Sequence, residues 1–211
     1  MNTNYKEKLI CVILAGGKGS RLDGKGKFNQ KFNNITLLEH VYERIKSQFS
    51  YIAVNVNNKE TNVKLNVEVI YDKFSKNIGP LAGIHASLSQ GNNINGEEGY
   101  VCIVPVDTPF LPKDLGKRLY SNMLKNNSDV VFAKSANRIH PTIGLWKNNL
   151  KKKLELDINK RNLLCIFYLI QNWCGREDLN LQGVSSTTTS TLRVYQFRHD
   201  RSIFNYNQFF C

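Results

Sequence analysis

An uninterrupted apolar segment, Leu9–Leu14, runs directly into a loop rich in glycine and lysine that reaches residue 27. A short apolar run of this kind, bounded by glycine, is typical of a strand that is covered on both faces of a sheet. Further strand-like runs alternate with helical patterns along the chain, which indicates an α/β domain with a mostly parallel sheet. The glycine-rich loop therefore leaves the carboxyl end of the first strand, where open α/β sheets bind their ligands.

The spacing of apolar residues predicts the order of the elements. Pro80 and Pro112 each suit the first turn of a helix. The pattern weakens after Asn148, and neither an internal repeat nor a linker interrupts the chain, so we expect one domain over residues 1–211, with 147–211 as a divergent C-terminal part. The expected strands cover residues 9–14, 51–56, 67–71, 100–104, 129–133, 142–146 and 192–197, and the expected helices cover residues 36–48, 80–90, the segment from 112 onward, and 162–173.

The net charge of +12, from 29 Lys and Arg against 17 Asp and Glu, favours anionic partners. Several lysines lie in Lys/Asn-rich stretches such as 151–153, for which a solvated surface is the simpler interpretation. Five cysteines without a CxxC pair indicate neither a disulfide framework nor a zinc site. No apolar run approaches the roughly 20 residues that cross a membrane. No nucleic-acid-binding motif accompanies the charge. We therefore expect a cytoplasmic protein with neither membrane nor nucleic acid as a partner.

The loop at residues 14–27 favours phosphate binding. Its glycines let the backbone approach phosphate oxygens closely, and Arg21 and Lys27 add positive charge. Two common phosphate-binding signatures are excluded by spacing: the third glycine of the dinucleotide fingerprint is replaced by Leu22, and Lys18 is not followed by Ser or Thr as in a P-loop. What remains is LAGG at the strand end, an arginine within the loop, and a lysine six residues after that arginine.

This loop and four later segments resemble those of the molybdenum cofactor guanylyltransferases, a family of nucleotidyltransferases. The segments occur in the order typical of that family, and together they cover most of residues 9–146. The resemblance implies a Rossmann-like, three-layer α/β nucleotidyltransferase fold with a mostly parallel sheet. The four segments are YD at 71–72, GPLAG at 79–83, PVDTPFLP at 105–112 and IHPT at 139–142.

The resemblance also implies the reaction, which is the transfer of GMP from GTP to the terminal phosphate of molybdopterin with release of pyrophosphate. Because the acceptor phosphate is already anionic, no general base is needed, and catalysis consists mainly of positioning and charge neutralisation. Mg²⁺ is the implied cofactor. GTP and molybdopterin are the implied partners, together with transient contact with proteins that deliver the cofactor or mature molybdoenzymes.

Three charged residues are implied at the phosphates. Asp107 follows the fourth expected strand and would hold Mg²⁺ as an oxygen ligand, or alternatively cap the turn that follows. Arg21 matches the signature arginine and could bind phosphate bidentately. Lys27 matches the signature lysine and would neutralise phosphate charge, although a solvated loop lysine close to Lys25 and Lys31 is the alternative.

Five further residues are implied around the base and the ribose. Leu14, Ala15 and Gly16 would present their backbone to the nucleotide. Asp72 would accept the adjacent N–H donors of guanine, or else form a turn. Asn55 matches a nucleotide-site asparagine at the end of the second strand, and the alternative is an asparagine that faces solvent there.

The match departs from the family pattern in three places. Gly26 stands where members usually carry Asp before the signature lysine. The C-terminal segment keeps Asn205 and Asn207 but lacks the Thr-Pro that usually follows, and residues 147–200 match poorly. A sister nucleotidyltransferase with another NTP and another phosphorylated acceptor, or a non-catalytic GTP-binding relative, therefore remains an alternative. His140, with the proline after it, is expected to shape the acceptor side without a catalytic role, and a structural histidine is the equal alternative.

Overall fold

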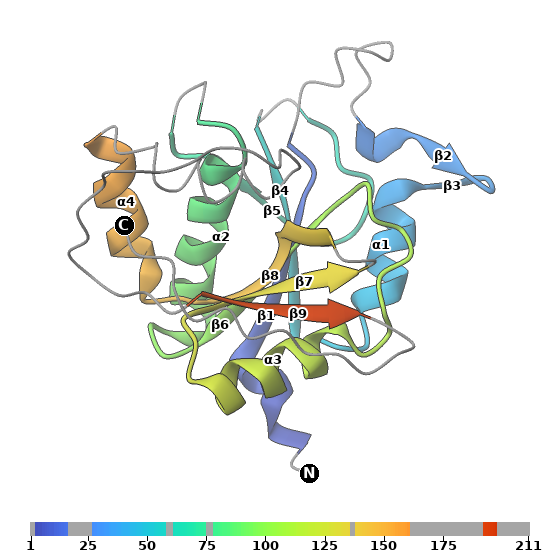
Figure 1. Cartoon of the computed structure of the whole chain (residues 1–211). Coiled ribbons are helices and arrows are strands. Elements are labelled where there is room, and N and C mark those ends of the chain that lie inside the picture. The colour runs from blue at the N-terminus through green and yellow to red at the C-terminus, as the bar shows by residue number, and fades with distance from the viewer. Residues whose placement is uncertain are drawn as a thin grey trace.

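The structure is an α/β arrangement with one large sheet and a short hairpin beside it (Figure 1). The computed structural model describes residues 3–16, 27–57, 61–74, 78–135, 138–160 and 192–197. The strands of the large sheet are β1 (Leu9–Leu14), β4 (Tyr51–Val56), β5 (Glu68–Tyr71), β6 (Tyr100–Pro105), β7 (Val130–Ser135), β8 (Arg138–Lys147) and β9 (Leu192–Phe197). The other elements are hairpin strands β2 (Lys31–Phe32) and β3 (Ile35–Thr36), helices α1 (Leu37–Ile45), α2 (Pro80–Asn95), α3 (Leu115–Asn126) and α4 (Leu150–Asn159), and the 3₁₀ helices η1 (Thr3–Lys8) and η2 (Lys27–Asn29).

The large sheet has the strand order β5-β4-β1-β6-β8-β7-β9. Strands β5, β4, β1 and β6 pair in parallel, as do β7 and β9. Only β8 runs antiparallel to both of its neighbours, β6 and β7. The predicted α/β class with a mostly parallel sheet is therefore confirmed within the described residues.

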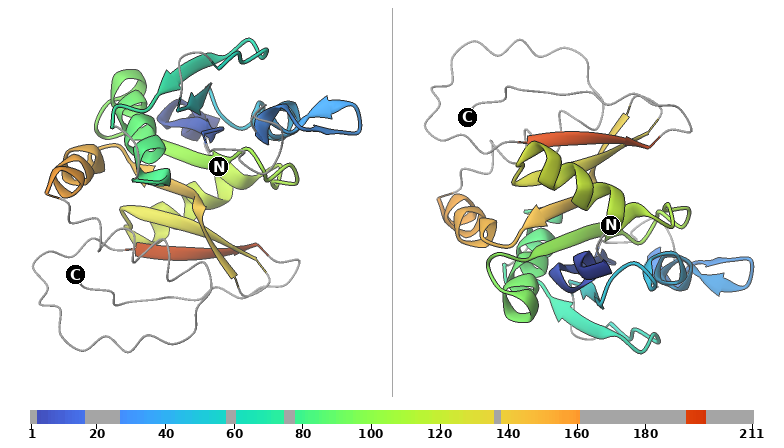
Figure 2. Two further views of the ribbon diagram at one scale, coloured as in Figure 1. Left: turned by 90° about the horizontal axis from the view of Figure 1, so that it is seen from above. Right: turned by 90° about the horizontal axis from the view of Figure 1, so that it is seen from below.

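Helices cover both faces of this sheet. One hydrophobic core contains buried side chains of α1 and α3, and a second core on the other face contains those of α2 and α4. Figure 2 shows α2 and α4 together on one side of the sheet and α1 on the other. The predicted three-layer arrangement follows from this division. Of the described helices, none is long and apolar enough to span a membrane.

Strand β1 lies at the centre of the parallel part of the sheet, between β4 and β6. Its residues alternate between the two cores: Leu9, Cys11 and Ile13 pack on the α1–α3 face, and Ile10 and Val12 pack on the α2–α4 face. All five are 0% exposed. This double burial is the physical reason for the uninterrupted apolar run in the sequence.

Helix α2 continues to Asn95, five residues beyond its expected end, and two further helices differ more from the sequence-based expectation. The helix expected to open at Pro112 begins instead at Leu115, because the residues before it form turns and Leu115 donates its N–H to the Pro112 carbonyl at 3.3 Å. Helix α4 was not predicted. It buries only Leu154 and Ile158, so its apolar stripe is too narrow to stand out among its lysines. The helix expected at residues 162–173 lies outside the described residues.

The β2–β3 hairpin is a second element that the apolar pattern did not predict. Its turn residues Asn33 and Asn34 both have positive φ values, 49° and 69°, as tight two-residue hairpin turns require. The hairpin leads directly into α1, whose first turn is closed by a capping box between Thr36 and Glu39. The expected helix at residues 36–48 is thus confirmed, with its end at Ile45.

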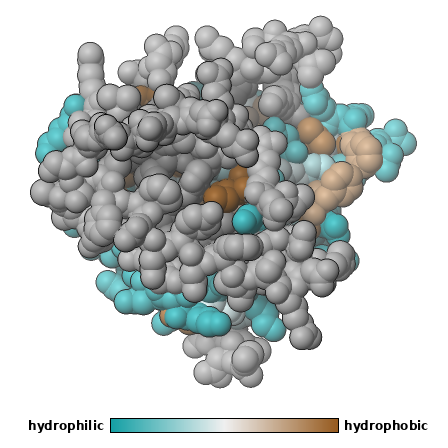
Figure 3. Space-filling model, viewed as in Figure 1, coloured by the Kyte–Doolittle hydropathy of each residue, from teal (hydrophilic) through white to brown (hydrophobic). Residues whose placement is uncertain are grey.

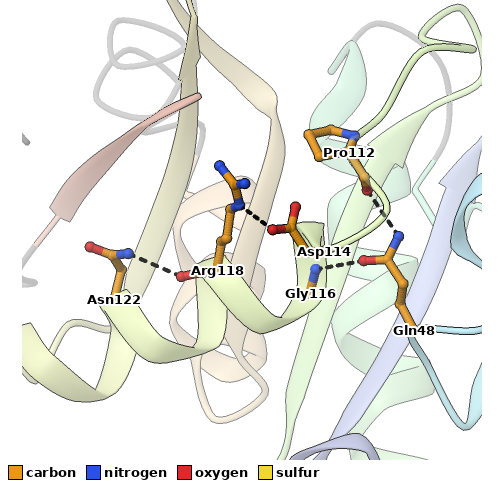
Figure 4. A network of polar contacts seen from close by, with 6 residues as sticks. All are labelled: Gln48, Pro112, Asp114, Gly116, Arg118 and Asn122. Carbon is orange, nitrogen blue, oxygen red and sulfur yellow. Dashed lines mark hydrogen bonds and ion pairs between the residues drawn. The ribbon is translucent and has the colours of Figure 1, made fainter. Parts of the chain in front are cut away.

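Gln48 joins the end of α1 to the loop that precedes α3 (Figure 4). Its side chain is buried, and its amide nitrogen donates to the carbonyl oxygens of Arg44 at 2.8 Å and Pro112 at 3.0 Å. Its amide oxygen accepts the backbone N–H of Gly116 at 3.0 Å. One side chain therefore fixes the end of the loop between β6 and α3 to the neighbouring helix.

We expect Gln48→Leu to lower the free energy of unfolding by about 1–3 kcal/mol, because the buried Gly116 N–H loses its partner and the partly buried Pro112 carbonyl loses a hydrogen bond. Urea titration followed by circular dichroism measures this change. Asn122→Ala is the matched control, since Asn122 donates only to the Arg118 carbonyl within its own helix, at 3.0 Å. Equal effects of the two substitutions would contradict the role given to Gln48.

Candidate nucleotide site

The carboxyl ends of β4, β1 and β6 are joined by backbone hydrogen bonds. Ala15 donates its N–H to the Asn55 carbonyl at 2.8 Å, and Val106 donates its N–H to the Leu14 carbonyl at 3.1 Å. Gly16 continues from this junction, and Asp107 directly follows Val106. Five of the residues selected from the sequence (Leu14, Ala15, Gly16, Asn55 and Asp107) therefore lie at one edge of the sheet.

Asn55 is buried, with 2% of its surface exposed, so the alternative of a solvent-facing asparagine is wrong. Its side-chain Nδ2 donates to Oδ1 of Asp72 at 2.9 Å. Burial raises the pKa of the Asp72 carboxyl, and the hydrogen bond from Asn55 partly opposes this by favouring the charged form. Asn55 thus holds the Asp72 carboxylate in place at the end of β5.

Helix α2 approaches Asn55 at Gly83. A Cβ atom placed on Gly83 would lie 2.6 Å from Oδ1 of Asn55 and 3.0 Å from Cδ2 of Leu14. A side chain there would have to displace the buried amide of Asn55. Close packing against Asn55 therefore explains why the last residue of the GPLAG segment is glycine, which the sequence alone did not show.

The start of α2 explains the rest of that segment. Gly79, which precedes the helix, has φ +56°, a conformation that favours glycine, and Pro80 occupies the first turn, where its missing N–H costs nothing. Among the described residues, no side chain caps this end of the helix. Because α2 connects the parallel strands β5 and β6, its N-terminus and the positive end of its dipole lie at the carboxyl edge of the sheet, on the α2–α4 side.

Asp107 lies exposed in the turn after β6. The turn is closed by Thr108, whose hydroxyl donates to the Pro105 carbonyl at 2.7 Å. Buried Val106 and Leu111 hold the loop on either side of Asp107. An exposed carboxylate is thus presented on an anchored loop at the same edge as the end of β1.

Asp72 and Asp107 do not converge on one point. Asp72 follows β5 and Asp107 follows β6, and β4 and β1 lie between those strands. At the usual spacing of neighbouring strands, three steps across the sheet amount to about 14 Å. The two carboxylates therefore serve separate ends of any ligand that extends along this edge.

Two of the expected phosphate-binding residues are incompletely placed. Lys27 opens the short helix η2, which is anchored by the buried side chain of Phe28. The side chain of Lys27 and the whole of Arg21 lie outside the described residues. The structure therefore places the backbone of the signature lysine and leaves its contacts with phosphate as a prediction.

Within the described ranges, no three His, Cys, Asp or Glu side chains gather into a metal cluster. Asp107 alone still fits Mg²⁺, because this hard cation commonly takes one or two carboxylates and completes its shell with phosphates and water. A zinc site, which needs several nitrogen or sulfur ligands, has no such support in this part of the chain.

His140 lies at the start of β8, where the sheet is irregular. Its partner across the ladder is Ala133, while the next partner pair is Phe132 with Gly144, so residues 141–143 bulge out of the register. Nε2 of His140 lies 2.7 Å from the hydroxyl oxygen of Ser135. This hydrogen bond gives the histidine a structural partner, and its expected place on the acceptor side stays a prediction.

Comparison with known proteins identifies relatives of this arrangement. A family model described as MobA-like NTP transferase domain matches residues 11–168. The molybdenum cofactor guanylyltransferase of Shewanella sediminis is 32% identical over 187 residues, which cover 87% of this chain and 92% of that protein. The enzyme of the same name from Rhizobium leguminosarum bv. trifolii is 37% identical over 150 residues, covering 71% of this chain and 68% of the relative.

Similarity to solved structures supports the fold. The crystal structure of molybdopterin-guanine dinucleotide biosynthesis protein A from Archaeoglobus fulgidus aligns with a TM-score of 0.59 over 77% of this chain and 79% of that one. The sequence identity in this alignment is 21%, so the likeness shows the arrangement of helices and strands only.

We expect Gly83→Ala to raise the pKa of Asp72 further, because its methyl group displaces Asn55 and removes the hydrogen bond that favours the carboxylate. A titration of the side-chain carboxyl carbons by ¹³C NMR measures this shift. Asn55→Leu should raise the same pKa, and adding Gly83→Ala to that variant should change nothing more. Additive shifts would show that Gly83 does not act through Asn55.

Proposed function

Because the chain is a nucleotidyltransferase of the MobA-like NTP transferase family, with curated guanylyltransferase relatives along most of its length, we propose that it transfers GMP from GTP to the terminal phosphate of molybdopterin. Pyrophosphate is the second product. The observation that carries the proposal is the row of Asp72, Asn55, the end of β1 and Asp107 along one edge of the sheet. This row suits an extended nucleotide, which has its base at one end and its phosphates at the other.

The base end of the proposed site is the Asn55–Asp72 pair. A carboxylate can accept several hydrogen bonds, so Asp72 can receive the adjacent N–H donors of guanine while Oδ1 also accepts from Asn55. Adenine lacks this pair of donors on its pairing edge. The backbone of Leu14, Ala15 and Gly16 lies between this pair and Asp107, in the position for the ribose and the α-phosphate.

The phosphate end is proposed to consist of Arg21, Lys27 and Asp107. Arg21 and Lys27 would bind phosphate oxygens directly. Asp107 would hold Mg²⁺, which when bound neutralises phosphate charge and withdraws electrons from the reacting phosphorus. The single exposed carboxylate, in a turn anchored by buried neighbours, is the support for this assignment.

In the proposed reaction an oxygen of the acceptor phosphate forms a bond to the α-phosphorus of GTP. The bond from the α-phosphorus to the oxygen that bridges it to the β-phosphate breaks, and pyrophosphate leaves with that electron pair. No proton has to move, so the protein contributes alignment of the two reactants and compensation of their negative charge. We also expect the reaction to take place in the cytoplasm, with transient contact with proteins that supply or receive the cofactor.

A sister enzyme with another NTP is the main alternative from the sequence, and the names of the relatives do not favour it. The non-catalytic alternative rested on Gly26 and the C-terminal segment, both of which lie outside the described residues. Transfer from each of the four NTPs, with and without molybdopterin, tests all three hypotheses together. Transfer from GTP that requires molybdopterin supports the proposal, and transfer from another NTP, or none at all, contradicts it.

Asp107→Asn should reduce the rate of GMP transfer by about 100-fold or more, because a preorganised group that compensates transition-state charge is typically worth this much. The rate is measured over a Mg²⁺ titration, in which the variant should also need more metal. Asp114→Asn is the matched control in the same loop region, since Asp114 pairs with Arg118 at 2.6 Å. Full activity of Asp107→Asn would remove Asp107 from the metal role.

Asp72→Ala should reduce the preference for GTP over ATP by about 10- to 100-fold, the usual range for a bidentate contact to a base edge. Competition between the two nucleotides in one transfer assay measures this ratio. Because burial raises the pKa of Asp72, wild-type affinity for GTP should also fall on acidification at a higher pH than for an ordinary aspartate. An unchanged nucleotide preference would exclude Asp72 from base selection.

A further inference from the structure

Two phenylalanines are exposed beside the phosphate end of the site. Phe110 is 72% exposed and Phe32 is 44% exposed, and their ring centroids lie 6.0 Å apart in an edge-to-face arrangement. Ile35, which is 39% exposed, lies opposite Phe32 on the hairpin. Figure 3 shows apolar side chains gathered on the side of the molecule where Figure 1 places the β2–β3 hairpin.

Both aromatic residues are held by their surroundings. Phe110 is followed by buried Leu111 and by Pro112, whose carbonyl accepts the hydrogen bond from Gln48. The backbone carbonyl of Phe32 accepts a hydrogen bond from Nε2 of His40 at 2.7 Å, and the ring centroids of Phe32 and His40 lie 5.4 Å apart. The backbone that carries each ring is therefore anchored, which lowers the entropy cost of binding a ligand between them.

The position of the pair excludes a role at the base. Phe110 is three residues beyond Asp107, so their Cα atoms are at most about 11 Å apart. Phe32 is five residues beyond Lys27, on the chain that leaves the phosphate loop. The Asn55–Asp72 pair instead lies on the other side of β1, towards β5. An aromatic surface here adjoins the phosphates at the end away from the base.

We propose that Phe32 and Phe110 form the surface on which the pterin ring of the acceptor stacks. The inference rests on the proposed function, which supplies an acceptor made of a planar fused heterocycle and a phosphate. Such a ring has two broad faces that an aromatic side chain can cover, and stacking there would orient the acceptor phosphate towards the α-phosphate. Exposed Lys31 and Lys113, which are close to the pair in sequence, suit an anionic molecule.

A small planar ligand fits this surface better than a protein partner does. Among the residues that the structure describes, this cluster exposes three large apolar side chains, whereas a stable protein interface buries about 800 Å² on each partner. The two rings meet at an interplanar angle of 86°, so one ring can stack on a flat molecule while the other contacts the edge of that molecule.

The test measures steady-state transfer with molybdopterin varied at saturating GTP, for Phe110→Ala and Phe32→Ala. Loss of either ring should raise the KM for molybdopterin, by about 5- to 150-fold for the ring that stacks, the range found when an aromatic residue that stacks on a base is removed. The KM for GTP should stay within about twofold, since the base site is not touched. Phe110→Trp, which keeps an aromatic ring at this position, should have the wild-type KM for molybdopterin. Leu124→Ala, at a residue 55% exposed on α3, is the matched control.

The outcomes separate this inference from the proposed function. A wild-type enzyme that fails to transfer GMP to molybdopterin contradicts the function itself. An active wild type whose alanine variants lose kcat but keep the acceptor KM overturns the stacking role. Unchanged kinetics with a lower sedimentation coefficient also overturns it and assigns the pair to an interface between copies. Binding of 6-hydroxymethylpterin phosphate, followed by fluorescence anisotropy, gives a readout without turnover and should weaken in both alanine variants.

Discussion

The geometry of the proposed base end depends on the contacts of the buried amide of Asn55. Its backbone carbonyl holds the end of β1, its side chain holds the carboxylate of Asp72, and its oxygen fills the space left by the missing side chain of Gly83. A buried amide without hydrogen-bond partners would cost free energy, so the loss of one of these contacts weakens the support for the others. The same residue thus ties two strand ends and a helix to one geometry.

The proposed phosphate end is held by different contacts, on the opposite face of the sheet. The loop that carries Asp107 is anchored by apolar side chains in the α1–α3 core and closed by the hydrogen bonds of Gln48. Because the two halves belong to separate cores, a change in one can alter the base site without moving the carboxylate of Asp107. Strand β1 belongs to both cores and keeps the halves in register.

Sequence patterns predicted the elements whose burial is strong and local. The apolar run of β1 and the proline at the start of α2 were sufficient to predict these two elements, because each signal reflects contacts of the segment itself. Helix α4 and the β2–β3 hairpin bury too little to leave such a signal. The contact of Gln48 with Pro112 joins residues 64 positions apart, and no local pattern encodes it. Phe110 and Leu111 are adjacent apolar residues, and only the fold separates the exposed one from the buried one.

The charge of the site gives the strongest argument for a metal. An exposed carboxylate beside a triphosphate would repel it, so Asp107 alone would weaken nucleotide binding. The repulsion reverses when a divalent cation lies between them, since the cation then attracts both anions. The proposed roles of Arg21 and Lys27, in a chain of net charge +12, would reduce the remaining repulsion between two phosphorylated reactants. The proposed role of Asp107 therefore requires that the nucleotide bind together with a metal ion.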